Sequence, residues 1–244
     1  MSANEAGLRR FRQAKLGSLA LPSKTRCKTM QINLNQLIIP SGHQLLLQDI
    51  DWPTLEQILA ELGDHRAARL SYSDRMMEIM VPMAAHEDDK RIIGRFIEII
   101  LEELDLEYRA LGSTTFKNAA MAQAVEPDEC FYIQHESQIR GQERIDLTRD
   151  PPPDLALEID LTSRTHFSNY ERLGVPELWR YDGRQLHISL LQNGHYEIST
   201  VSRQFPKLAL LEAIPRYVQE SKQLGRQKTM KDFREWVRNS LNHS

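Results

Sequence analysis

Acidic residues on two neighbouring stretches of the chain have the types and spacing of a metal site. The first stretch is EPDECFYIQ, residues 126–134, and the second is PDLALEID, residues 153–160. Both stretches predict strands, in which side chains alternate between two faces. Glu158 then lies within an apolar strand, and Asp128 stands between apolar neighbours. A carboxylate in such surroundings is costly unless it is paired or binds a metal ion.

Two carboxylates that converge from adjacent strands form an oxygen-rich site, which suits Mg²⁺ or Mn²⁺. A divalent ion there can orient a water molecule, lower its pKa and neutralise charge on a phosphate. Asp128 and Glu158 are therefore the candidate metal ligands. Two acids in an acidic segment also arise by chance, so spacing alone leaves a solvated acidic surface as the alternative. The flanking acids are expected to have other roles: Asp154 and Asp160 in turns or caps, Glu126 and Glu129 facing solvent.

Other catalytic motifs are missing from the sequence. No glycine-rich phosphate loop follows a strand, and no G-x-S-x-G nucleophile motif is present. His86 and Glu87 begin an H-E-x-x-H string, but residue 90 is a lysine. A nucleotide-binding fold therefore has little support, and neither does a helical zinc site of this type.

The elements that must position the acids alternate between helix and strand. Periodic apolar residues and capping signals predict helices over 51–63, 86–104, 168–174, 214–223 and 229–242. Strands are predicted in a hairpin over 68–82 with its turn at 73–74, and in seven further runs between 106 and 201. This interleaving predicts an α/β or α+β fold, in which a mixed sheet is flanked by helices.

The composition of the 244-residue chain is that of a globular protein, with 41% apolar and 27% charged residues. No run approaches the roughly 20 apolar residues of a membrane span, so no membrane association is expected. Two cysteines, Cys27 and Cys130, form neither a disulfide scaffold nor a four-cysteine zinc site. A reducing, cytoplasmic location is therefore expected.

Charge is unevenly distributed along the chain, although the net charge is only −3. Residues 1–30 carry a net charge of +6, residues 201–244 carry +5, and the middle carries −14. Residues 1–29 lack both a periodic apolar pattern and the apolar core of a signal peptide, which predicts a disordered basic extension. Residues 30–244 are expected to form a single domain.

Four motifs occur together in this order: AHEDDK (85–90), EPDECFYIQ (126–134), PPPDLALEIDLTSR (151–164) and YERLGVPELWRYDG (170–183). Together they resemble the PD-(D/E)XK restriction-endonuclease-like superfamily, and more closely the Uma-two family of predicted restriction endonucleases, abundant in cyanobacteria. The resemblance covers roughly residues 30–240. It implies a restriction-endonuclease-like core with Asp128 and Glu158 as metal ligands, the backbone carbonyl of Ile159 as a further ligand, and Glu87 as an outlying acid.

The chain departs from the superfamily pattern at one position. The pattern places a lysine two residues after the second acid, and here that residue is Asp160. Many relatives carry the lysine in the following helix, but residues 161–206 contain none. Arg164 is the nearest cation in the sequence; it stays protonated, so it can bind a phosphate but cannot act as a base. Lys90 or Lys117 reach the site only if the fold brings them in.

The leading hypothesis is a Mg²⁺-dependent endonuclease that hydrolyses phosphodiester bonds of DNA. In this hypothesis Arg164 or a distal lysine supports the transition state, and C-terminal cations contact phosphates, Lys228, Lys231 and Arg234 among them. A solvated helix face is the alternative for those cations. The rival hypothesis, motivated by the missing lysine, is a catalytically impaired module of the same fold that binds nucleic acid or a partner. The sequence leaves the choice between DNA and RNA open, and also the oligomeric state, a homodimer included.

Overall fold

A computed structural model describes residues 36–63, 68–112, 114–118, 122–161 and 167–242, which belong to one compact unit over residues 34–244. The predicted disordered extension, residues 1–29, lies outside the described residues. The helices are α1 (Trp52–Leu62), α2 (Ala84–Glu103), α3 (Glu136–Ile139), α4 (Phe167–Leu173), α5 (Leu210–Leu224) and α6 (Arg226–Asn242).

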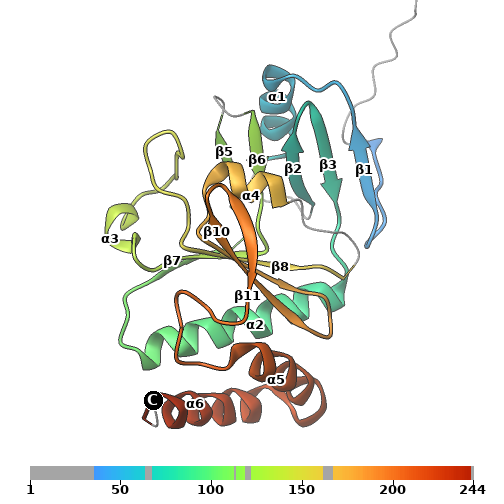
Figure 1. Ribbon diagram of the computed structural model, residues 1–244. Coiled ribbons are helices and arrows are strands. Elements are labelled where there is room, and N and C mark those ends of the chain that lie inside the picture. The colour runs from blue at the N-terminus through green and yellow to red at the C-terminus, as the bar shows by residue number, and fades with distance from the viewer. Residues whose placement is uncertain (1–35, 64–67, 113, 119–121, 162–166, 243–244) are drawn as a thin grey trace, which may run out of the picture. The chain divides into compact units, whose positions relative to one another are not determined.

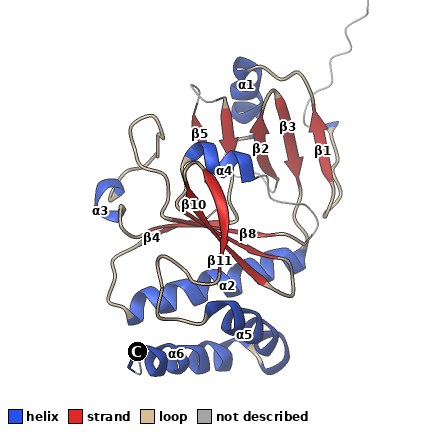
Figure 2. Cartoon of the chain, viewed as in Figure 1, coloured by secondary structure: helices blue, strands red, loops and turns tan. Residues whose placement is uncertain are grey.

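The strands form two sheets, drawn as red arrows in Figure 2. The first sheet is antiparallel and has the order β1-β3-β2-β6-β5, with β1 (Gln44–Leu47), β2 (Arg69–Ser73), β3 (Met76–Met80), β5 (Phe116–Asn118) and β6 (Gln123–Val125). The second has the order β11-β10-β9-β8-β7-β4, with β4 (Arg109–Leu111), β7 (Glu129–Tyr132), β8 (Leu155–Ile159), β9 (Glu177–Tyr181), β10 (Leu186–Gln192) and β11 (His195–Ser199).

The second sheet is mixed because β8 and β9 run parallel, while its other neighbouring strands are antiparallel. A parallel pair needs a crossover connection, and the segment that joins β8 to β9 contains α4. The predicted fold class is therefore confirmed: a mixed sheet flanked by helices. The sequence did not show that the hairpin over 68–82 belongs to a separate sheet.

The main core lies where α2 packs between the second sheet and the C-terminal helices α5 and α6 (Figure 1). Phe96 and Ile97 of α2 meet Leu157 of β8 and Phe233 of α6 in this cluster, all of them fully buried. A second cluster lies on the opposite face of β8 and includes Tyr170 of α4. Apolar packing on both faces thus fixes β8 at the centre of the molecule.

Some element boundaries differ from those predicted. The Asp51 cap of α1 is confirmed, because its Oδ1 accepts a hydrogen bond from the Thr54 amide at 2.9 Å. The β2–β3 turn lies at Asp74–Arg75, one residue later than predicted, and both residues have positive φ. Helix α5 begins at Leu210, before the predicted start at 214, and it accommodates Pro215 within the helix.

No helix in the described part of the chain is long and apolar enough to cross a membrane.

Candidate active site

Strand β8 presents Glu158 on the face opposite the α2 core. Leu155, Leu157 and Ile159 point into that core, so period-two alternation turns Glu158 towards α4. There the Tyr170 hydroxyl donates a hydrogen bond to Oε1 of Glu158. The strand alternation predicted from the sequence is therefore confirmed.

Glu158 lines a pocket between the two sheets with an interior volume of about 60 Å³, enough for a few water molecules. Its polar lining comes from β2, β3, β8, α2 and α4 and from the residues after β6 and β8: Arg69, Ser71, Glu78, His86, Glu126, Asp160, Asn169 and Tyr170. Burial raises the pKa of Glu158 to about 7, and the carboxylates of Asp160 and Glu78 act in the same direction. The Tyr170 hydroxyl and the Arg69 charge oppose that rise.

Asp128 lies directly before β7 and is completely buried. Its Oδ2 accepts a hydrogen bond from the Ile159 amide at 2.6 Å, which ties the two acidic motifs together. Nε2 of His86 lies 3.2 Å from the same oxygen, and the Arg69 guanidinium forms an ion pair with Oδ1. Arg69 and His86 line the pocket, whereas Asp128 does not. The two predicted acids are thus joined through the backbone of Ile159, and Asp128 is covered by a cation.

Glu87 stands in the first turn of α2, next to this cluster. Its Oε1 lies 3.1 Å from Nη2 of Arg69, and its Oε2 lies 3.0 Å from Nζ of Lys90. Contact with His86, together with Lys90 and Arg69, lowers the pKa of Glu87 to about 2. Arg69 therefore bridges Asp128 and Glu87, the acid that the family resemblance implied as an outlying site residue.

Lys90, one of the cations considered in place of the missing lysine, reaches the cluster through its ion pair with Glu87. Arg164 lies outside the described residues. Lys117 pairs with Glu56 of α1 at 2.8 Å, and Asp160, which occupies the lysine position, pairs with Arg180 at 3.2 Å. The cation that reaches Asp128 is instead Arg69 of β2. Sequence reasoning missed it, because only the pairing of β2 with β6 brings this strand beside the acidic motifs.

Two acids that were predicted to face solvent are buried, and that prediction is wrong. Glu126 accepts hydrogen bonds from the Leu70 amide at 3.0 Å and from the Thr115 hydroxyl. Glu129 lies beside Gly94 of α2, and burial raises its pKa. The burial of both acids follows from strand pairing. The acidic composition of this segment had suggested that these strand ends are exposed to solvent.

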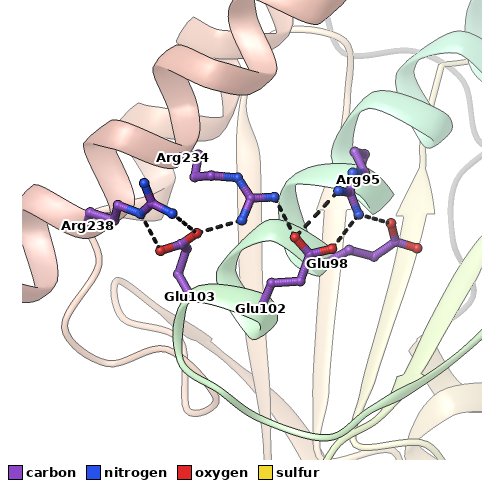
Figure 3. Close-up of polar contacts among 6 residues, drawn as sticks. All are labelled: Arg95, Glu98, Glu102, Glu103, Arg234 and Arg238. Atoms are coloured by element: carbon purple, nitrogen blue, oxygen red, sulfur yellow. Dashed lines mark hydrogen bonds and ion pairs between the residues drawn. The ribbon is translucent and has the colours of Figure 1, made fainter.

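The three C-terminal cations lie on α6, which packs on α2 away from α4 and the first sheet (Figure 1). Lys228 pairs with Asp232 of the same helix, and Lys231 is exposed. Arg234 forms ion pairs with two acids of α2, with 2.5 Å to Oε1 of Glu103. Figure 3 shows it within a network of six residues that joins the two helices: Arg95, Glu98, Glu102, Glu103, Arg234 and Arg238. Arg234 therefore has a structural role in holding α6 on α2.

The donor set of the pocket suits a hard divalent cation better than zinc. Glu78, Glu126, Glu158 and Asp160 line it, and His86 is the one histidine among its lining residues. Within the described ranges, no three His, Cys, Asp or Glu side chains are close enough together to hold a metal ion. The oxygen donors are of the type that Mg²⁺ or Mn²⁺ prefers, and the Asp128 carboxylate is already paired with Arg69.

Comparison with known proteins places the chain in a family. The sequence matches Uma2, described as "Putative restriction endonuclease", over residues 52–221, and the chain belongs to this family. Among solved structures it is similar to a "putative nuclease belonging to DUF820" from Anabaena variabilis ATCC 29413. The TM-score is 0.47 and the identity 14%, over 65% of this chain and 96% of that chain. No curated protein matches the sequence.

Proposed function

We propose that the protein is a Mg²⁺- or Mn²⁺-dependent endonuclease that hydrolyses phosphodiester bonds of DNA. The observation that carries the proposal is the joining of Asp128 to the Glu158 strand through the Ile159 amide, beside a pocket lined by acids. Membership of the Uma2 family supports the same class of reaction.

In this proposal Asp128 and Glu158 hold the metal ion, together with the backbone carbonyl of Ile159. When bound, the ion would supply a Lewis acid that makes water a better nucleophile and neutralises phosphate charge. The Ile159 amide orients the Asp128 carboxylate, and the Tyr170 hydroxyl orients that of Glu158. Both contacts position ligand oxygens in advance, which limits the rearrangement that binding requires.

The experiment is thermal melting with and without Mn²⁺, paired with nicking of supercoiled plasmid. A ligand at a hundredfold excess over its Kd stabilises a protein by about 2.7 kcal/mol. Asp128→Asn and Glu158→Gln are each expected to abolish the metal-induced rise in Tm and the nicking. Glu197→Gln, an exposed acid of β11, is the matched control and is expected to keep both. A full metal shift in Glu158→Gln would contradict the proposed site.

A specific observation favours a second candidate, a nucleic-acid-binding module without cleavage. Position 160 is an aspartate, and Asp128 is buried under Arg69. Such a module would retard DNA on a gel and leave supercoiled plasmid intact in Mg²⁺ and in Mn²⁺. The same plasmid assay therefore separates the two functions.

A further inference from the structure

Arg69 occupies the point at which the candidate acids meet. It is the first residue of β2, in the first sheet, yet its guanidinium pairs with Asp128 through Nη1 and with Glu87 through Nη2. It also lines the pocket beside Glu158, and only 7% of its surface is exposed. A single cation from one sheet is thus shared among acids held by the other sheet and by α2.

The burial of Asp128 explains why a cation is needed there. A carboxylate removed from water is stable only when it is paired and hydrogen-bonded. The Ile159 amide and His86 contact Oδ2, which leaves Arg69 as the partner of Oδ1 among the described residues. A divalent ion that bound Asp128 would need the same electrostatic position, so the guanidinium and the metal ion compete.

The geometry of an arginine also suits the step for which the superfamily uses lysine. A guanidinium presents several donors in one plane and can bind two phosphate oxygens together. Arg69 already borders the pocket that contains Glu158, so its guanidinium lies next to the space proposed for the phosphate.

We propose that Arg69 is the cation that takes the place of the missing motif lysine. Without metal, Arg69 neutralises Asp128 and Glu87 and occupies the position in which the metal ion would bind Asp128. When metal binds, the released guanidinium contacts the phosphate to be cleaved. This inference rests on the proposed function, because it assigns a role at the same metal site.

The test compares Arg69→Gln and Arg69→Lys with the unchanged chain, and Arg75→Gln is the matched control. Arg75 lies on the turn of the same hairpin and its side chain is exposed. The first readout is the Mn²⁺ concentration that gives half of the maximal rise in Tm. Removal of a competing charge at contact distance is expected to lower that concentration at least about tenfold in Arg69→Gln. The midpoint Mn²⁺ concentration of Arg69→Lys is expected to lie between those of Arg69→Gln and the unchanged chain. That of Arg75→Gln is expected to match the unchanged chain.

The second readout is plasmid nicking at saturating Mn²⁺. Arg69→Gln is expected to lose at least about a hundredfold in rate, and Arg69→Lys to recover part of it. Tighter metal binding combined with slower nicking is a pattern that loss of structure alone does not produce, since a damaged fold weakens both. If Arg69→Gln does not fold, the Arg69→Lys titration decides, because that variant keeps the positive charge.

The proposed function and the inference about Arg69 are contradicted by different results. An unchanged or higher Mn²⁺ midpoint in the Arg69 variants, with a normal metal shift in the parent chain, overturns the inference and leaves the proposed function standing. Unchanged nicking in Arg69→Gln overturns the phosphate contact. No metal shift in the parent chain or in any Arg69 variant overturns the metal site itself, and the inference falls with it. A shift that appears only after Arg69 is replaced supports the competition directly.

Discussion

Asp128 and Glu158 have different electrostatic surroundings, although Asp128 directly precedes β7 and Glu158 lies in the adjacent strand β8. Asp128 is met by a guanidinium, an imidazole and a backbone amide. Glu158 receives one hydroxyl hydrogen bond and lies near other carboxylates. Without metal, the charge of Asp128 is therefore compensated, whereas the charge of Glu158 is disfavoured.

The first residue-scale prediction concerns pH. Burial raises the pKa of Glu158 from 4.5 to about 7, so the folded protein binds this proton more tightly than the unfolded chain does. Its contribution to the free energy of unfolding is thus largest below pH 4.5 and declines as pH rises to about 7. Glu158→Gln is expected to remove that decline and to be more stable than the parent chain at pH 8.

Urea unfolding of both chains at intervals from pH 5 to pH 8, without metal, measures this difference. Glu87 contributes little to the change, because its pKa of about 2 in the folded protein and its ordinary value of 4.5 both lie below that range. Parallel stability curves for the two chains would show that Glu158 is not protonated near neutrality.

Asp154 provides a second residue-scale prediction. Its Oδ2 accepts hydrogen bonds from the amides of Ile133 at 2.7 Å and His135 at 3.0 Å, and its Oδ1 lies 2.6 Å from Nδ1 of His135. Asp154→Ala leaves a buried amide without an acceptor and is expected to cost about 2 to 3 kcal/mol of stability. The Mn²⁺-induced rise in Tm is expected to remain, because we place Asp154 outside the metal shell. Loss of that rise in a folded variant would move Asp154 into the site.

At the scale of elements, α6 combines two kinds of cation. Arg234 faces α2 and its acids, whereas Lys231 is exposed. Each lysine–phosphate contact contributes about 0.9 to the log–log salt slope of binding to duplex DNA. Neutralising Lys228 and Lys231 together is expected to flatten that slope by up to about 2. Arg234→Gln is expected to leave the slope unchanged and to lower stability by about 1 kcal/mol. An unchanged slope in the lysine double variant would place the binding surface elsewhere.

The sequence predicted local features better than it predicted contacts between residues that are distant in the chain. Alternation in β8 located Glu158 on its face, and the Asp51 cap located the start of α1, because both depend on residues close in the chain. The burial of Glu126 and Glu129 and the position of Arg69 depend on pairing between distant strands. No local pattern encodes that pairing, so the sequence placed Glu126 and Glu129 in solvent and suggested Arg164, Lys90 or Lys117, but not Arg69, as the cation.

At the scale of the whole molecule, the compact unit begins after the basic N-terminal stretch. A chain that starts at Met30 is expected to melt within a few degrees of the full chain, since residues 1–29 lack the periodic apolar residues that a core requires. Differential scanning calorimetry of the two chains at equal concentration measures this. Insolubility or a large drop in Tm would show that the basic stretch contributes to folding.

The packing of α2 has a consequence for the time scale on which Asp128 can become accessible. This helix carries His86 and Glu87 in its first turn, and along its length it is covered by the second sheet and by α5 and α6. Amides in a segment enclosed on both sides exchange with deuterium mainly through global unfolding. The mid-helix amides of Ile97 and Ile100 are therefore expected to be among the slowest to exchange. If a metal ion reaches Asp128 as proposed, rotation of the Arg69 side chain is the expected route, because such a rotation is far faster than any opening of the backbone.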